Sequence, residues 1–213
     1  MSRAVARLVI GPEHDGMQMS LADFARAEAQ PGYLYELEKG VVVVADLPDM
    51  WHALIVHRLR RAFYQYDVAH PGSVAFIGGG GESCLRMTDI ESERHPDVSV
   101  YLTAPPADDP QPWDCWTPDI VIEVVSKSSK QRDYKIKPTE YLEAGVRLCC
   151  IVDRFTRRIT VLTRKLNQWR RQELGSGDTL RTSLLPGFAL KLADAFADIP
   201  TRELKAPRRS RRR

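Results

Sequence analysis

Two short apolar runs in the second half of the chain, residues 120–125 (IVIEVV) and 148–152 (LCCIV), constrain the fold more than any other feature. A run of this length, with apolar side chains at successive positions, is typical of a strand that is buried on both faces of a sheet. Between the two runs lies the basic segment 126–146, which we expect to be helical in its later part and to end at Gly145. The chain therefore contains a sheet with at least two strands that are covered on both sides.

Turn residues and periodicity predict the other elements. Ser20 and Asp23 have the spacing of a helix N-terminus. The glycine run 78–81 is followed by neither a Lys-Ser/Thr pair nor a helical pattern, so we interpret it as a hairpin turn between strands 73–77 and 83–87 rather than as a phosphate-binding loop. The remaining predictions are a hairpin of strands 33–38 and 41–45, a helix over about 49–68, strands at 98–102, 158–164 and 167–173, and a final strand and short helix.

Length and composition favour one folded domain. The 213 residues are 43% hydrophobic, which is enough to bury a core without metal or disulfide staples. We expect a loose lead-in over residues 1–18, the domain over 19–200 and a disordered basic tail over 201–213. No apolar run approaches the ~20 residues of a membrane helix, and the N-terminus lacks the apolar core of a signal peptide, so we expect no membrane association.

The cysteines indicate a reducing compartment. Cys84, Cys115, Cys149 and Cys150 have neither the spacing of a zinc site nor that of a disulfide framework. Cys149 and Cys150 lie in an apolar run and are expected to be core thiols. This pattern fits a cytoplasmic protein best.

The net charge of +3 conceals an uneven distribution. Residues 1–125 carry 9 basic and 19 acidic side chains, a net charge of −10, whereas residues 126–171 carry 13 basic and 4 acidic ones, a net charge of +9. Residues 202–213 add a net charge of +6. The chain thus has an acidic first half, a basic middle and a basic tail.

Three acidic residues in strand contexts are the candidates for chemistry. Glu123 interrupts the first apolar run, Asp97 precedes strand 98–102 directly after a proline, and Glu36 lies in the strand YLYEL. A buried carboxylate is costly unless it is paired or bound to a cation, and hard cations such as Mg²⁺ prefer carboxylate oxygens. The three acids could together hold one divalent cation, whereas each alone could be an ion-paired or rim carboxylate.

These acids belong to an ordered series of motifs. The series runs through YELEKG at 35–40, His52, HPDVSV at 95–100 and PDIVIEVVS at 118–126, and ends with Asp133, Lys137, Tyr141 and Gly145 at four-residue spacing. It resembles the Uma family of restriction-endonuclease-like proteins, in the PD-(D/E)XK nuclease superfamily, over residues 20–196. The resemblance implies an α/β (α+β) fold with a restriction-endonuclease-like mixed β-sheet core flanked by helices. It also implies a site for Mg²⁺ (or Mn²⁺) made by Asp97 and Glu123, with Glu36 and His52 in supporting roles.

The lysine of the site is the least regular part of the series. The wider superfamily has a lysine two residues after the glutamate, and that position is Val125 here. The resemblance places the lysine at Lys137, with Lys135 as the alternative, and either could instead be a solvated side chain. Because proline is tolerated only in the first turn of a helix, we expect the helix proper to begin near Pro138, with Lys137 at its entrance.

The histidines leave alternatives open. His52 could contact the scissile phosphate or transfer a proton, or it could only hydrogen-bond at the start of its helix. His57 is five residues further on and does not share the face of His52, so a His-His metal pair is not expected. His95 could lie on the rim of the site.

The predicted function follows from the acids and the basic segment together. Lys127, Lys130, Arg132 and Lys135 follow Glu123 closely and are predicted to bind backbone phosphates of DNA. We expect a metal-dependent endonuclease that hydrolyses DNA phosphodiester bonds, acts as a homodimer and uses no organic cofactor. The alternatives are a catalytically weak nuclease-fold protein that binds nucleic acid or a protein, and a metal-dependent hydrolase of small phosphorylated molecules.

Overall fold

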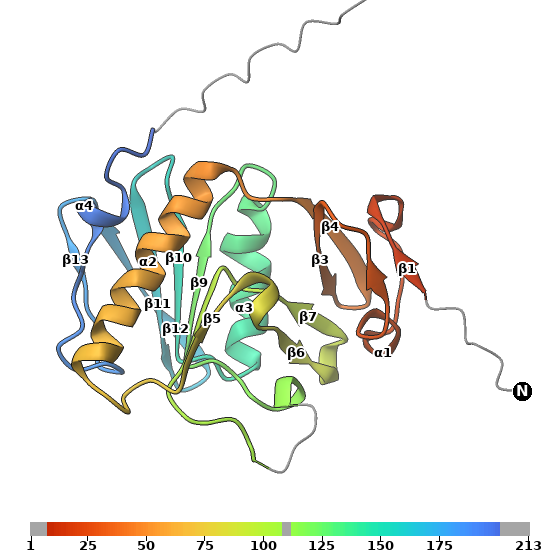
Figure 1. Cartoon of the computed structure of the whole chain (residues 1–213), viewed down its shortest axis with the longest axis horizontal. Coiled ribbons are helices and arrows are strands. Elements are labelled where there is room, and N and C mark those ends of the chain that lie inside the picture. Colours follow the sequence, from red (N-terminus) through yellow and green to blue (C-terminus); the bar gives the residue numbers. More distant parts are fainter. Residues whose placement is uncertain (1–7, 108–111, 201–213) are drawn as a thin grey trace, which may run out of the picture.

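A six-stranded mixed β-sheet forms the centre of the protein, whose computed structural model describes residues 8–107 and 112–200 (Figure 1). The strand order is β12-β11-β10-β9-β8-β5. The β9–β10 pair is parallel and the other pairs are antiparallel, so the predicted mixed sheet is confirmed. The strands are β5 (Phe76–Gly78), β8 (Val98–Tyr101), β9 (Ile120–Val124), β10 (Leu148–Asp153), β11 (Arg158–Lys165) and β12 (Gln168–Gly175).

Two helices cover the two faces of this sheet. α2 (Met50–Ala69) begins at Asp49, whose carboxylate accepts a hydrogen bond of 2.8 Å from the backbone N–H of His52. Its apolar stripe is buried against the sheet and consists of Ile55, Leu59 and Phe63. α3 (Lys137–Glu143) packs on the opposite face. The helix predicted over about 49–68 is thus confirmed.

Alternation along β9 decides which helix each side chain meets. Ile120, Ile122 and Val124 pack in the core under α2, whereas Val121 packs in the core under α3. Because successive side chains of a strand point to opposite faces, Glu123 shares the α3 face with Val121. The chemistry-bearing acid therefore faces the helix that carries the candidate lysine.

A smaller four-stranded sheet lies beside the central one, in the order β4-β3-β7-β6 (Figure 1). The predicted hairpin is confirmed as β3 and β4, joined by Lys39 and Gly40, which both have positive φ angles. The strands of this sheet are β3 (Tyr33–Glu38), β4 (Val41–Asp46), β6 (Leu85–Met87) and β7 (Ser92–Arg94). The remaining elements are β1 (Val9–Ile10), β2 (Glu28–Ala29), β13 (Thr179–Leu180), β14 (Leu190–Lys191), α1 (Leu21–Phe24) and α4 (Leu192–Ala195).

The chain passes between the two sheets several times. Residues 47–49 lead from β4 into α2, residues 79–84 lead from β5 to β6, and residues 95–97 lead from β7 into β8. Asp97 is the last residue of the connection from β7 into β8, so it lies at the junction between the two sheets.

Pro138 is accommodated by a π-helical turn, Arg132–Ile136, which leads directly into α3. The backbone N–H of Lys137 donates to the carbonyl of Arg132, five residues back rather than four. The wider turn accommodates a residue that has no N–H of its own and whose ring would clash with a normal preceding turn. α3 proper begins at Lys137, as expected, but it continues a helical segment instead of starting a new one.

Two expectations differ from the structure. The glycine run does not form a hairpin, because β5 belongs to the six-stranded sheet and β6 to the four-stranded one. A Cβ atom on Gly79 would lie 2.1 Å from the carbonyl oxygen of Asp97, so the run passes closely along the Asp97 backbone and needs glycine there. Residues 8–18 are not a loose lead-in: β1 pairs with β2, and the N–H of Gly16 donates to the carbonyl of Val42. The predicted basic tail lies outside the described residues.

Cys149 and Cys150 are buried in β10, as predicted, and all four cysteines are free thiols. Within residues 8–107 and 112–200, no helix is long and apolar enough to cross a membrane.

Candidate active site

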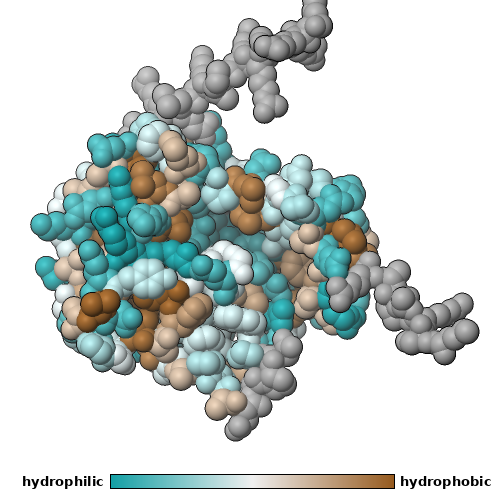
Figure 2. Space-filling view, viewed as in Figure 1, coloured by the Kyte–Doolittle hydropathy of each residue, from teal (hydrophilic) through white to brown (hydrophobic). Residues whose placement is uncertain are grey.

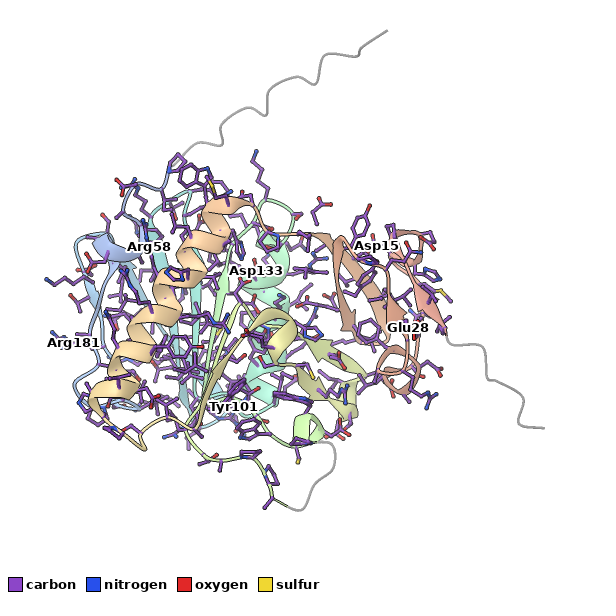
Figure 3. The ribbon with its side chains drawn as sticks, viewed as in Figure 1. Asp15, Glu28, Arg58, Tyr101, Asp133 and Arg181 are labelled. Carbon is purple, nitrogen blue, oxygen red and sulfur yellow. The ribbon has the colours of Figure 1, made fainter. Side chains whose placement is uncertain are left out.

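A cleft of about 540 Å³ opens where the two sheets meet. Its walls come from β3 and β4, the start of α2, the loop after β9 and the turn before α3. Asp133, which Figure 3 labels near the middle of the molecule beside α3, lies on its inner wall. All the predicted acids, Glu36, Asp97 and Glu123, and both His52 and Lys137 line this cleft.

Asp97 and Glu123 lie at the same end of the adjacent strands β8 and β9. The β8–β9 ladder places Val98 opposite Ile122, so that Asp97 comes opposite Glu123. The backbone N–H of Val124 donates to Asp97 Oδ2 at 2.7 Å and fixes that carboxylate against β9. Both acids line the cleft: Asp97 is held from the side of α2 by His52, and Glu123 faces α3.

Lys137 is the central cation of the site. Its Nζ lies 3.2 Å from Glu123 Oε2, 3.1 Å from Glu36 Oε1 and 3.7 Å from Asp133 Oδ1. Burial favours a neutral lysine, but the surrounding carboxylates outweigh it and raise the pKa of Lys137, so the ammonium group stays charged. Lys135, the alternative lysine, is exposed and does not line the cleft.

Glu36 is held by cations on two sides. Arg94 is completely buried, and it contacts Glu36 at 3.1 Å, Glu38 at 2.9 Å and Glu140 at 2.7 Å. Burial alone would raise the pKa of Glu36, but Lys137 and Arg94 lower it to about 2. Glu36 is therefore an ionised partner of two cations.

The pKa of Glu123 is shifted in the opposite direction to that of Glu36. Burial raises the pKa of Glu123 above its usual range, because Lys137 only partly offsets the burial and the neighbouring charges of Asp97 and Asp133. Its second oxygen accepts a hydrogen bond from the Tyr141 hydroxyl. Burial and the neighbouring acids thus favour the neutral form of Glu123, and Lys137 only partly opposes them.

The three predicted metal ligands are not assembled into one group. In the part of the chain that the structure describes, no three His, Cys, Asp or Glu side chains are arranged to hold a metal ion. Asp97 and Glu123 are adjacent, whereas Glu36 is engaged by Lys137 and Arg94.

His52 fixes Asp97 to α2. Its Nε2 lies 2.9 Å from Asp97 Oδ1, and its backbone N–H is bound by the helix-capping carboxylate of Asp49. That carboxylate also forms a two-pronged ion pair with Arg154, from the turn after β10. The geometry gives His52 a role that differs from the phosphate contact, proton transfer and helix-start hydrogen bond considered from the sequence, namely positioning of Asp97.

His95 lies on the cleft wall, as considered from the sequence. Its Nε2 lies 3.1 Å from Glu93 Oε1, and its backbone N–H donates to Glu36 Oε1 at 3.3 Å. Glu93 in turn binds Arg86 at 2.7 Å. These contacts tie β6 and β7 to Glu36.

The predicted phosphate-binding residues divide into two pairs. Lys127 and Arg132 line the cleft, together with Arg154, whereas Lys130 and Lys135 do not. Lys130 instead extends to within 3.8 Å of Asp153. The cleft mouth is nevertheless basic on the side of the loop after β9.

Sequence reasoning missed Arg94 and Glu140 as parts of the site. Both side chains are charged and yet fully buried, Arg94 in β7 and Glu140 in α3. Apolar periodicity gives no signal for such a pair, because a strand that reads Ser-Glu-Arg resembles an exposed one.

Comparisons with known proteins bear on the fold and the family of the chain. The chain shares 16% sequence identity with a putative nuclease from Anabaena variabilis of known crystal structure, with a TM-score of 0.69 over 84% of this chain and 97% of that one. At this identity the likeness concerns the fold alone. The comparison with curated proteins gives no match. Residues 21–193 match the Uma2 family, described as putative restriction endonuclease. The chain therefore belongs to the Uma2 family.

Proposed function

We propose that this protein is an endonuclease that hydrolyses DNA phosphodiester bonds with a divalent cation, Mg²⁺ or Mn²⁺, held by Asp97 and Glu123. The observation that carries the proposal is the meeting of these groups inside one cleft that has a basic mouth. Asp97 accepts a hydrogen bond from the N–H of Val124, the residue after Glu123, and the Lys137 ammonium lies 3.2 Å from Glu123. Membership of the Uma2 family supports the same reaction class.

The donor set fits a divalent cation. Carboxylate oxygens are the ligands that Mg²⁺ and Mn²⁺ prefer. Burial, followed by the neighbouring acids, raises the pKa of Glu123, and a bound cation would favour its ionised form. A cation bound by these acids would supply a more acidic water and neutralise charge on the phosphate.

The residues of the chain have separate tasks in this proposal. His52 and the Val124 N–H hold the two oxygens of Asp97 in place, and the Tyr141 hydroxyl orients Glu123. Lys137 stays protonated and can donate to a phosphate oxygen or hold the attacking water, where a fixed positive charge stabilises the transition state. Glu36 positions Lys137 through their 3.1 Å ion pair.

Nicking of a covalently closed plasmid tests the proposal, because such a substrate has no ends. We expect cleavage with Mg²⁺ or Mn²⁺ that is lost with a chelator and in Asp97→Asn and Glu123→Gln. Glu143→Gln is the matched control, since Glu143 is exposed on α3. Cleavage that persists in both active-site variants would contradict the assignment of these acids.

One observation favours a second candidate, a catalytically weak nuclease-fold protein that binds nucleic acid. Both carboxylate oxygens of Glu123 are already engaged, one by Tyr141 and one by Lys137. Salt-sensitive binding of oligonucleotides without cleavage in any divalent metal would favour this alternative.

The proposal includes a homodimer, because two copies of one site can cut both strands of a duplex. Sedimentation of the protein with and without duplex DNA tests this part. A monomer in both conditions that makes only nicks would contradict it.

A further inference from the structure

A second groove, of about 480 Å³, runs along the outer face of α2. It shares Pro48, His52, Gly80 and Asp97 with the main cleft. The two hollows therefore meet at Asp97, and the candidate site is open on two sides.

The spacing of residues on α2 explains the lining of this groove. His57, Arg61 and Tyr64 are exposed and recur every three or four residues, which places them on one face of the helix. The opposite face is the buried stripe that packs on the sheet. Strongly hydrophilic side chains lie over α2 in Figure 2.

The chemistry of the groove fits a polyanion with aromatic bases. Arg60 and Arg61 supply positive charge, and Tyr64 is 46% exposed. Its hydroxyl donates to the Ile77 carbonyl at 3.2 Å and holds the ring in place. Exposed aromatic rings beside cationic side chains are the usual means of binding single strands without regard to sequence. Glu82 forms an ion pair with Arg60, which leaves Arg61 as the better probe.

The arginines of α2 are separated by role. Arg58, labelled in Figure 3, donates to backbone carbonyls of Ala195 and Ala197 and fastens α2 to the C-terminal segment. Arg60 and Arg61 line the groove. Because Arg60 is paired with Glu82, Arg61 is the groove arginine whose charge Glu82 does not offset.

We infer that this groove holds the polynucleotide strand on one side of the scissile phosphate, while the basic mouth of the main cleft holds the strand on the other side. From Ala53 to Tyr64 the helix rises by about 16 Å, which is the length of several nucleotides at the ~3.4 Å rise of a DNA strand. A strand that continues past Asp97 in both directions is cut internally. The inference rests on the proposed function and extends it to the path of the substrate.

Arg61→Glu tests the groove, with Arg170→Glu as a matched control on the exposed edge strand β12, outside both hollows. Two substrates are compared with Mn²⁺: closed plasmid DNA, and bis(p-nitrophenyl) phosphate, a diester with no strand on either side. We expect Arg61→Glu to slow plasmid cleavage by about tenfold, to leave the small diester unaffected, and to lower the salt slope of oligonucleotide binding by about one. Arg170→Glu should change none of these.

The outcomes separate the inference from the function on which it rests. Equal plasmid cleavage by Arg61→Glu and the unmodified protein, or an equal loss on both substrates, would overturn the groove while leaving the nuclease intact. Metal-free binding of a labelled oligonucleotide that is weakened by Arg61→Glu, in a protein that cleaves neither substrate, would support the groove and count against the nuclease.

Discussion

The two faces of the central sheet differ in what they bury. Against α2, β9 presents Ile120, Ile122 and Val124, which are all apolar. Against α3 the same strand presents Glu123, in contact with Lys137 and Tyr141. The α2 face is packed by apolar side chains, whereas the α3 face combines apolar packing, to which Val121 contributes, with a buried ion-pair network. The difference teaches that the alternation of one strand decides where candidate chemistry is placed in this fold.

The largest expected effect is on the charged side. Arg94→Met leaves Glu36, Glu38 and Glu140 without their shared guanidinium. Removing one partner from a buried ion pair costs about 3–5 kcal/mol, which denaturant unfolding would measure. The control is Arg171→Met, whose exposed pair with Glu173 is worth at most about 1 kcal/mol. Equal losses in the two variants would remove the distinction between a buried network and a surface pair.

On the apolar face, Ile122→Ala creates a cavity in the core under α2. We expect the free energy of unfolding to fall by about 2–5 kcal/mol. The cleavage rate of the protein that remains folded should not change, because the side chain points away from the cleft. A lower cleavage rate in Ile122→Ala, measured at a temperature where the variant is fully folded, would show that the two faces of the sheet are coupled.

The adjacent substitution, Glu123→Gln, should do the reverse. We expect plasmid cleavage to fall by about 100- to 1,000-fold, equivalent to about 2.7–4 kcal/mol in the activation barrier. The free energy of unfolding should change far less than in Ile122→Ala, since the amide fills the same space and can still accept from Tyr141. Parallel rate and unfolding measurements on the two neighbours test the comparison most directly.

The smallest expected effect lies at the junction of the two sheets. Asp49→Ala removes the cap of α2 and should cost about 1 kcal/mol at neutral pH. Hydrogen bonds from Arg154 lower the pKa of Asp49 despite some burial, so its contribution is present above the ordinary aspartate pKa of ~3.9 and is lost as the pH falls through the lowered value. Unfolding of Asp49→Asn, which keeps a capping oxygen, should lack this pH dependence. A parallel pH profile in the two proteins would contradict it.

The sequence was most informative where apolar alternation is broken by one charged residue. Glu123 stands out within IVIEVV, and the structure places it on the face of α3 as a buried carboxylate. The hairpin, α2 and the strands of the central sheet follow from periodicity that packing reinforces. The position of Lys137 came from the family resemblance, and the π-helical turn that brings it to Glu123 has no signal in the sequence beyond Pro138.

What the sequence did not show depends on contacts between distant segments. Arg94 joins β3 to α3 through Glu36 and Glu140, which are far apart along the chain. The glycine run was assigned to a hairpin because local turn chemistry cannot reveal that its neighbours are in different sheets. Its glycine at position 79 is required by the backbone of Asp97, a non-local reason.

The π-helical turn before α3 has a consequence for sequence change in this chain. Such a turn is equivalent to one residue inserted into a regular helix, and one residue corresponds to about 100° of rotation at 3.6 residues per turn. Deleting a single residue from Arg132–Ile136 would restore a regular spiral and swing Lys127 and Ser129 around the helix axis relative to Lys137. The turn thus determines how the loop after β9 is oriented around the helix axis relative to the lysine that faces the acids. Insertion or deletion of one residue in the turn would change that orientation.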